Sequence, residues 1–419
     1  MNPNNFISSI KPLYYVSRIV GLAPLSISSS CELREASIGW KIHTCCVLLL
    51  VIVSSSYAVM ERVRQSDLVA TVVVNEFLMM SMGAIKAITS IIMCLTLNRV
   101  PAREVLRKIV KIDSFLLTDP DVTYKNIFKF SFIQTIIVYV YVLSLFMCDT
   151  LVWTRAVDQM GADYLISGYP HRIVNITSVV EFCDFVLLLK SRIRALNSKL
   201  CSLLERASDS RNSSSKNDIA NQKSIRNVKT PRIGPYVDSA KVFRQVDSPY
   251  IYDKELEYFH KLRELYDELC DVTRLINSMY GLLLLLELGV TTIELTSSLY
   301  LSLATLLKIQ NVQINVIGMF SSLMFSWLIL YSFKLICITM PSHLATTEME
   351  NTVVIVHKLL LVKQFDHSTI TELKLFSQQL LQRKVKFSAF GFLNLDYSLL
   401  FTIIGGVTTY LVIAMQYKM

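Results

Sequence analysis

Seven long apolar segments divide this chain of 419 residues, and they constrain its fold more than any other feature. Each is long enough to cross the hydrocarbon core of a bilayer, which takes about 20 apolar residues in a helix. Because lipid offers the backbone no hydrogen-bond partner, such segments must satisfy their own polar groups, as helices do. The sequence therefore predicts an all-α, multi-pass protein of the plasma membrane. The predicted spans are residues 40–60, 68–97, 127–153, 165–190, 275–303, 312–340 and 393–417.

Composition also favours a membrane protein over a soluble one. Hydrophobic residues make up 52% of the chain and charged residues 18%, whereas a soluble domain carries about 25% charged residues. We assign the net charge of +9 to loops that face anionic lipid, and we expect no nucleic-acid partner. The nine cysteines and six histidines show no spacing typical of a disulfide framework, a metal site or a catalytic nucleophile. We therefore expect no enzyme and no cofactor.

The distribution of Lys and Arg predicts the orientation, because these residues accumulate in cytoplasmic loops. The loops on one side of the predicted membrane carry 31 of them, and those on the other side carry 6. When the long segment 191–274 is left out, the counts are still 15 and 6. The N-terminus is therefore predicted to be intracellular and the C-terminus extracellular. This orientation is opposite to that of a G-protein-coupled receptor, so we expect no G protein as a partner.

Apolar residues at helical spacing continue beyond several spans, and this predicts a cytoplasmic helical domain. The amphipathic stretches are 192–204, 250–269, 346–361 and 370–381. They predict a helical bundle that anchors subunits to one another, and helices lying on the membrane surface are the alternative. Ser, Asn and Lys dominate residues 207–249, which predicts a disordered loop there. The predicted order is a cytoplasmic segment 1–38, spans in 39–190, helix extensions in 191–274, spans in 275–340, anchor helices in 341–392 and a last span in 393–419.

Short motifs from one end of the chain to the other resemble those of insect gustatory receptors. Thr409 and Tyr410 are followed by five apolar residues and Gln416, which is similar to the signature that closes the final helix of that family. Three further landmarks are similar to the fructose- and sugar-sensing subgroup: Tyr14–Arg18 leading into Gly21–Leu25, Asp149 with Trp153, and Trp327 followed by Pro341–Ala345. The resemblance implies a homotetrameric, ligand-gated cation channel in which the seventh helix of each subunit lines the pore.

Spacing in the last span agrees with a pore-lining role. Gly405, Thr409, Val412 and Gln416 recur at offsets of four, three and four, so they share one face of a helix. In a channel, Gln416 would offer an amide oxygen to passing cations, and Ile413 or Tyr417 would form an apolar constriction. No ring of carboxylates is evident, which predicts weak selectivity among cations. The alternative is a packed helix whose Gln416 bonds a neighbouring helix.

Ionisable and tryptophan side chains inside the spans are candidates for a ligand site. A sugar bonds carboxylates and amides through its hydroxyls and stacks its C–H face on indole, so acids beside tryptophans fit a monosaccharide such as fructose. The resemblance supports Asp149, Trp153 and Trp327 by position. Glu76, Glu294 and Gln313 are added from the predicted topology. Lys86, Glu181 and Asp184 are interpreted first as structural pairs, and Trp153 could instead anchor the chain at the membrane interface.

Three functions remain open at this point. The first is a cation channel gated by a sugar, with cations, membrane lipid and three identical subunits as its other partners. The second keeps the channel but replaces the sugar by a bitter or other plant compound. The third is a membrane transporter, which is disfavoured because the sequence shows neither internal inverted repeats nor broken helices.

Overall fold

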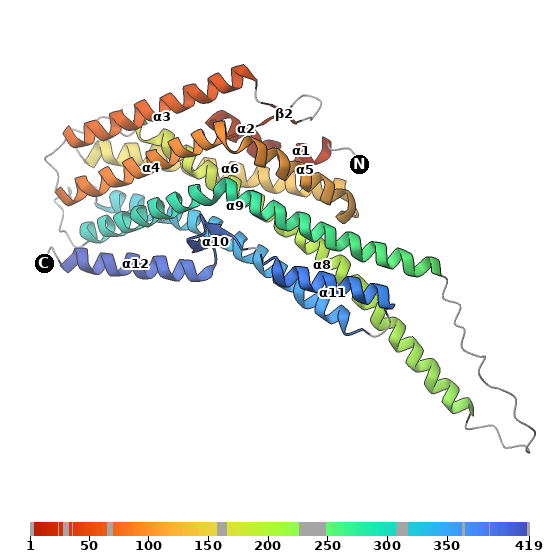
Figure 1. The fold of residues 1–419 in the computed structure, drawn as a ribbon. Helices are drawn as coiled ribbons and strands as arrows, with labels where there is room; N and C mark the ends of the chain where they lie inside the picture. Colours follow the sequence, from red (N-terminus) through yellow and green to blue (C-terminus); the bar gives the residue numbers. More distant parts are fainter. Residues whose placement is uncertain are drawn as a thin grey trace, which may run out of the picture. The chain divides into compact units, whose positions relative to one another are not determined.

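The computed structural model describes residues 4–23, 25–27, 33–35, 37–64, 70–156, 166–225, 249–306, 317–362, 365–384 and 386–416 (Figure 1). Over these residues the fold is helical except for two short antiparallel hairpins. The helices are α1 (Asn4–Ser9), α2 (Lys11–Val20), α3 (Ile38–Arg64), α4 (Ala70–Thr96), α5 (Arg99–Leu116), α6 (Pro120–Ala156), α8 (Tyr169–Ile225), α9 (Pro249–Leu306), α10 (Ile317–Leu360), α11 (His367–Gln382) and α12 (Tyr397–Gln416). The strands are β1 (Leu25–Ile27), β2 (Leu33–Glu35), β3 (Ser388–Ala389) and β4 (Leu393–Asn394).

Five helices in the described part of the chain are long and apolar enough to cross a membrane. They are α3, α4, α6, α9 and α10, and they coincide with the first, second, third, fifth and sixth predicted spans. The predicted fourth span begins α8, where Arg172, Glu181 and Asp184 interrupt the apolar run. The predicted seventh is the shorter helix α12. The helical, multi-pass fold is thus confirmed, and the count of seven and the orientation stay predictions.

Helix α8 differs from the sequence prediction at its end. It continues to Ile225, although residues 207–225 belong to the segment predicted to lack order. The remainder of that segment, residues 226–248, lies outside the described residues. Low apolar content argues against packing, but it does not prevent a helix that is already nucleated from extending by local hydrogen bonds.

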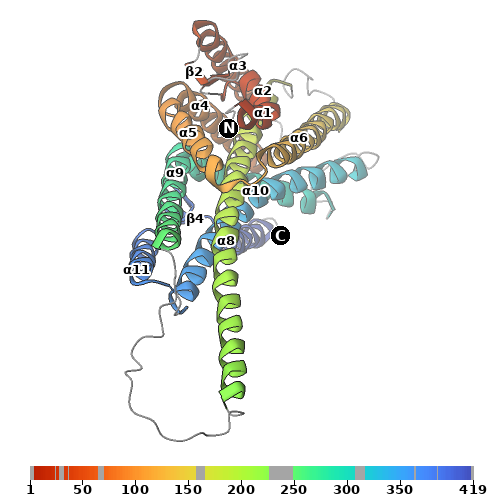
Figure 2. The same cartoon turned by 90° about the vertical axis from the view of Figure 1, so that its right-hand side faces the viewer.

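The chain divides into two compact units. The first comprises Met1–Ser191, Asp271–Thr346 and Val385–Met419, and the second comprises Arg192–Cys270 and Thr347–Lys384. Within the first unit, α3 and α4 lie side by side in both views, and the short helices α1 and α2 lie against α6 (Figure 2). One buried cluster of this unit joins α6, α8 and α10, and includes Val142, Phe146, Val180, Trp327 and Tyr331.

The second unit is a helical bundle whose apolar stripes face one another. Leu262, Leu265 and Leu269 of α9 are fully buried, as are Leu373 and Phe376 of α11. Polar contacts join the same elements: Arg263 Nε donates to Glu372 Oε1 over 2.7 Å, and Thr352 Oγ1 of α10 donates to Asn197 Oδ1 of α8 over 2.7 Å. The stripes predicted on these segments therefore pack on each other within one subunit. Their position on the cytoplasmic side stays a prediction.

A tight hairpin, β3–β4, precedes the last helix and fixes its start. Its turn needs left-handed backbone at Phe390 (φ 53°) and Gly391 (φ 78°). Asn277 of α9 secures the hairpin, because its Nδ2 donates to the Lys386 carbonyl over 2.8 Å and its Oδ1 accepts from the Ser388 N–H over 3.4 Å. The hairpin backbone comes so close to α9 that a Cβ on Gly281 would lie 3.1 Å from the Phe390 nitrogen.

Asp396 caps the first turn of α12. Its Oδ1 accepts hydrogen bonds from the Ser398 N–H at 3.0 Å and the Leu399 N–H at 3.3 Å, and from the Ser398 hydroxyl. The Ser398 hydroxyl and these amides favour the ionised carboxylate, so they hold the pKa of Asp396 below its ordinary value. A carboxylate here also meets the positive end of the helix dipole.

Candidate ligand-binding site

Asp149, Trp153 and Trp327, three of the predicted ligand residues, line one small cavity in the first unit. The cavity has a volume of about 70 Å³. Its walls come from α4, α6, α8, α9 and α10, so helices distant in sequence converge on it. The other wall residues are Met79, Met80, Gly168, Tyr169, Arg172, Ser297, Ser298, Leu301, Met324 and Tyr331.

Asp149 is buried in this wall and holds two donors. The indole N–H of Trp327 donates to Oδ1 over 3.0 Å, and the Tyr169 hydroxyl donates to Oδ2 over 3.2 Å while sharing its proton with the Phe146 carbonyl at 3.0 Å. The Tyr169 ring is itself stacked on Phe146 with centroids 4.1 Å apart, which fixes the direction of its hydroxyl. The carboxylate is thus oriented from two helices and keeps further lone pairs for another donor.

Trp327 contacts both a cation and another aromatic ring. The Arg172 guanidinium is 4.5 Å from the centre of its indole, and the Tyr331 ring is stacked with it at 5.6 Å. Arg172 also donates from Nη1 to the Tyr331 hydroxyl over 3.4 Å. Trp153 is in edge contact with Phe320 at 5.1 Å. A ligand that stacks on Trp327 would therefore share the indole with these neighbours or compete with them for it.

A buried chain of charges crosses the same unit. Lys86 of α4 is 2.9 Å from Glu287 of α9, and Lys334 of α10 is 2.7 Å from both Glu287 and Glu294. All four side chains are at most 8% exposed. Two ammonium groups therefore neutralise two carboxylates away from water, which is the condition under which buried charges are tolerated.

The remaining predicted ligand residues have different surroundings. Glu294 does not line the cavity, because its carboxylate is bonded to Lys334. The side chain of Glu76 and all of Gln313 lie outside the described residues. Their contact with a ligand stays a prediction. For Glu294 that contact would also require an ion pair to open.

Arg172 and Tyr169 are wall residues that sequence reasoning missed. In the sequence, Arg172 is only one of the six positive charges assigned to the side opposite the cytoplasm. A charge in the first turn of an apolar helix was the available signal, because such residues are rarely without a partner. Tyr169 gave no comparable signal, since a tyrosine at a helix end is ordinary in membrane proteins.

Helix α12 packs along a single stripe. Leu399, Ile403 and Val407 are buried, and Leu411 packs against the apolar cluster that joins α6, α8 and α10. With about 3.6 residues per turn, Gly405, Thr409, Val412 and Gln416 lie on the opposite side. All four of these residues are exposed, as is Ile413. Tyr417, the other predicted constriction residue, lies outside the described part of the chain.

The sequence and the fold can now be compared with known proteins. A family model described as 7tm chemosensory receptor matches residues 10–419, nearly the whole chain. The chain belongs to this family of chemosensory receptors. Together with its apolar helices, this makes the receptor a multi-pass membrane protein.

Two gustatory receptors of Drosophila melanogaster are among the receptor's similar proteins. The putative gustatory receptor 28b is 32% identical over 168 residues, which cover 38% of this chain and 34% of that protein. Gustatory receptor 68a is 29% identical over 171 residues, 39% of this chain and 42% of that protein. The receptor thus matches about a third and two fifths of the length of these relatives.

Solved structures of an olfactory receptor share the fold. The insect olfactory receptor OR5 from Machilis hrabei matches with a TM-score of 0.60 at 11% identity, and its complex with eugenol matches with a TM-score of 0.65 at 10% identity. Each match covers 97% of this chain and 97% of the other. At so low an identity the likeness concerns the arrangement of helices. The resemblance to insect gustatory receptors is therefore supported by the chemosensory-receptor family model and by the two Drosophila relatives, and not by these structures.

Proposed function

We propose that the receptor is a ligand-gated, non-selective cation channel of four identical subunits, opened by a small molecule such as the monosaccharide fructose. One observation carries the proposal: α12 buries a single stripe in its own subunit and leaves the opposite stripe exposed. A helix surrounded by lipid should be apolar on its free side, whereas this stripe carries the amide of Gln416 and the hydroxyl of Thr409, which donates to the Gly405 carbonyl of its own helix over 2.9 Å. Four copies that place this stripe around an axis would give those groups water and ions as partners.

The cavity around Asp149 supports a sugar as the ligand. It offers an oriented carboxylate, the Tyr169 hydroxyl and two indoles, which match hydroxyls and a C–H face. At about 70 Å³ it is smaller than the roughly 300–1,000 Å³ of small-molecule pockets. A sugar would therefore fit only after the walls move apart. A state with a wider cavity would bind the ligand better, and such differential affinity is what lets a ligand shift an equilibrium.

Recording from cells that express this chain alone would test the proposal. We expect fructose to evoke inward cation current, with a panel of other sugars applied for comparison. Silence to every sugar, with surface expression demonstrated, would contradict a sugar-gated channel. A tag after Met419 should be accessible to antibody on intact cells. Staining that requires permeabilised cells would contradict the predicted orientation.

Cysteine substitution would separate the pore stripe from the packed stripe of α12. A charged thiol reagent applied during ligand-evoked current should block Thr409→Cys and leave Val407→Cys unaffected. The unmodified receptor must be recorded in parallel, because Cys45, Cys46 and Cys148 are exposed. Block of both variants, or of neither, would place the ion path elsewhere.

A plant aromatic compound is the second candidate ligand, and the cavity walls favour it. Trp153, Trp327, Tyr331 and Met324 present aromatic and thioether surface, which suits an aromatic ring as well as a sugar. The related olfactory receptor was solved with eugenol. A response to eugenol-like phenols without a response to sugars would decide in favour of this candidate.

A further inference from the structure

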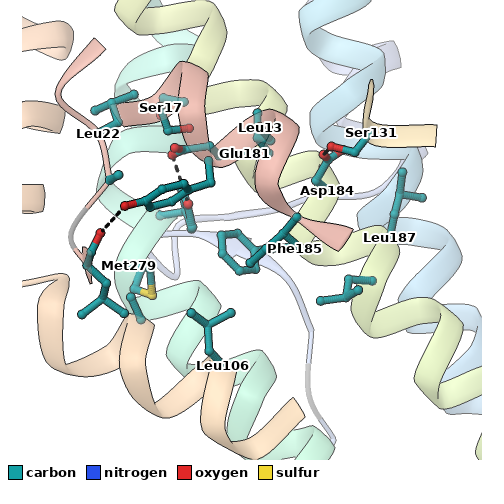
Figure 3. A pocket seen from close by; sticks show the side chains of 18 of the residues that line it. Leu13, Ser17, Leu22, Leu106, Ser131, Glu181, Asp184, Phe185, Leu187 and Met279 are labelled. Atoms are coloured by element: carbon teal, nitrogen blue, oxygen red, sulfur yellow. Dashed lines mark hydrogen bonds between the residues drawn. The ribbon is translucent and has the colours of Figure 1, made fainter. Parts of the chain in front are cut away.

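A second and larger cavity lies in the first unit and shares no wall residue with the cavity around Asp149. Its volume is about 500 Å³, within the range of small-molecule sites. Helices α2, α4, α5, α6, α8 and α9 form its walls. Figure 3 shows Glu181 and Asp184 at the cavity on α8, with Leu106 of α5 and Met279 of α9 among the apolar walls.

The walls of this cavity are mostly apolar, and two carboxyls on α8 are the charged groups among them. Glu181 accepts a hydrogen bond from the Tyr280 hydroxyl at 3.4 Å. Asp184 Oδ2 accepts from the Ser131 hydroxyl at 3.4 Å, and the Gln134 side chain also interacts with this carboxyl, whereas the buried Oδ1 has no hydrogen bond of good geometry within the described part of the chain. A buried acceptor without a donor is destabilising, so a donor at this point would stabilise the site.

The described wall residues include no Lys, Arg or His. Lys86, which acts on Glu181 from behind the wall, is already engaged with Glu287 at 2.9 Å. The two carboxyls therefore face an apolar space without a cation of their own. This charge pattern would repel an anionic ligand and would favour one that carries a positive charge.

The cavity reaches the protein surface beside α6. Asn126 and Phe130, one turn apart on that helix, line the cavity and are exposed, Phe130 by 54%. Further exposed apolar side chains, Phe128 and Phe132, flank this stretch. An amphiphile could therefore arrive along the apolar surface of α6 without unfolding a helix.

We propose that this cavity binds an amphiphilic amine, a protonated amino group on an apolar body. The ammonium group would donate to Asp184 Oδ1 and to Glu181, and the apolar body would lie against the side chains of Leu106, Leu188 and Leu283. An ammonium supplies up to three donors and the complementary charge, which neither an alcohol nor a fatty acid provides. The proposal concerns binding and does not depend on ion conduction.

Native mass spectrometry of the purified full-length receptor, released from nanodiscs, would test this site. The probes are octylamine, octanol and octanoate, which share one apolar chain and differ in their polar group. We expect the receptor to bind octylamine at least about tenfold more tightly than octanol, a difference of about 1.4 kcal/mol. Octanoate should bind most weakly.

Three variants separate the site from non-specific uptake. Glu181→Gln with Asp184→Asn should lower octylamine binding to the level of octanol and leave octanol unchanged. Ala102→Phe, which fills the cavity from α5, should lower the binding of both. Glu104→Gln is the matched control on α5, outside the wall, and should behave as the unmodified receptor. Equal octylamine binding before and after neutralisation, or octanoate binding as tight as that of octylamine, would overturn the proposal.

Discussion

The indole N–H of Trp327 donates to the carboxylate of Asp149 over 3.0 Å, so a residue of α10 is bonded to one of α6 that precedes it by 178 positions. This bond joins two of the helices that bound the small cavity. Any widening of the cavity that moved α10 away from α6 would lengthen it. The bond between Trp327 and Asp149 is therefore expected to break when the cavity of the proposed channel widens.

Replacing Trp327 by phenylalanine removes that donor and keeps an aromatic ring. A hydrogen bond to a charged group contributes about 1.5–3 kcal/mol. We therefore expect the concentration of ligand for half-maximal current to change by about 13- to 160-fold, measured by whole-cell recording. Trp40→Phe is the matched control, because Trp40 is equally buried but lies in another cluster. Equal responses of both variants would show that the bond between Trp327 and Asp149 does not contribute to the ligand response.

Lys334→Met should strongly destabilise the receptor. It leaves Glu294 without its cation and removes one of the two cations of Glu287, and breaking a buried pair in this way costs about 3–5 kcal/mol. The double variant Lys334→Met with Glu294→Gln restores charge balance, because Lys86 still neutralises Glu287. We expect it to recover most of the lost thermal stability, measured as the melting temperature of the purified protein. A single variant as stable as the unmodified receptor would mean that these charges are solvated.

Two glycines of α9 should respond in opposite ways to alanine. At Gly281 the new Cβ would meet the Phe390 nitrogen at 3.1 Å, and the hairpin before α12 would have to move. We expect a loss of about 1–3 kcal/mol there. At Gly289 nothing lies within 4 Å, so alanine should stabilise the helix by its better propensity, about 1 kcal/mol. Thermal unfolding of the two variants measures the difference. Equal shifts would show that the hairpin does not press on α9.

The cap at Asp396 should matter in a pH-dependent way. Asp396→Ala leaves the first amides of α12 without an acceptor, at a cost of about 0.5–2 kcal/mol. Because the pKa of Asp396 is lowered in the folded receptor, the cap contributes fully above the ordinary pKa of an aspartate, about 3.9. Its contribution is lost as pH falls through the lower folded value. The difference in melting temperature between the two proteins should therefore be constant near neutral pH and vanish in strong acid.

The sequence was sufficient to predict the helices whose apolar runs are long and uninterrupted. It also indicated that Asp149, Trp153 and Trp327 belong to one site, and the structure places all three around one cavity. The ion-pair partners of the charged residues inside the helices could not be predicted in the same way. The sequence predicts a structural pair for Lys86 without naming its partner, and the structure shows that the partner is Glu287, because packing decides which helix faces α4. Lys334 and Arg172 were missed for the same reason.

Residues 207–225 show a structure that composition did not predict. Their polar composition predicts no packed core, whereas the structure continues α8 through them. Composition reports how much surface a segment can bury. It does not report whether a neighbouring helix will extend into it, since each added residue needs only one local hydrogen bond.

The one-sided packing of α12 has a consequence for how the receptor is made. A newly synthesised subunit carries a helix whose threonines and Gln416 would meet acyl chains until sister subunits arrive. In the proposed tetramer, insertion of α12 would be complete only on assembly. The yield of mature receptor would then rise more steeply than the amount of chain produced. Cells that express the receptor weakly would degrade most of the chains that they synthesise.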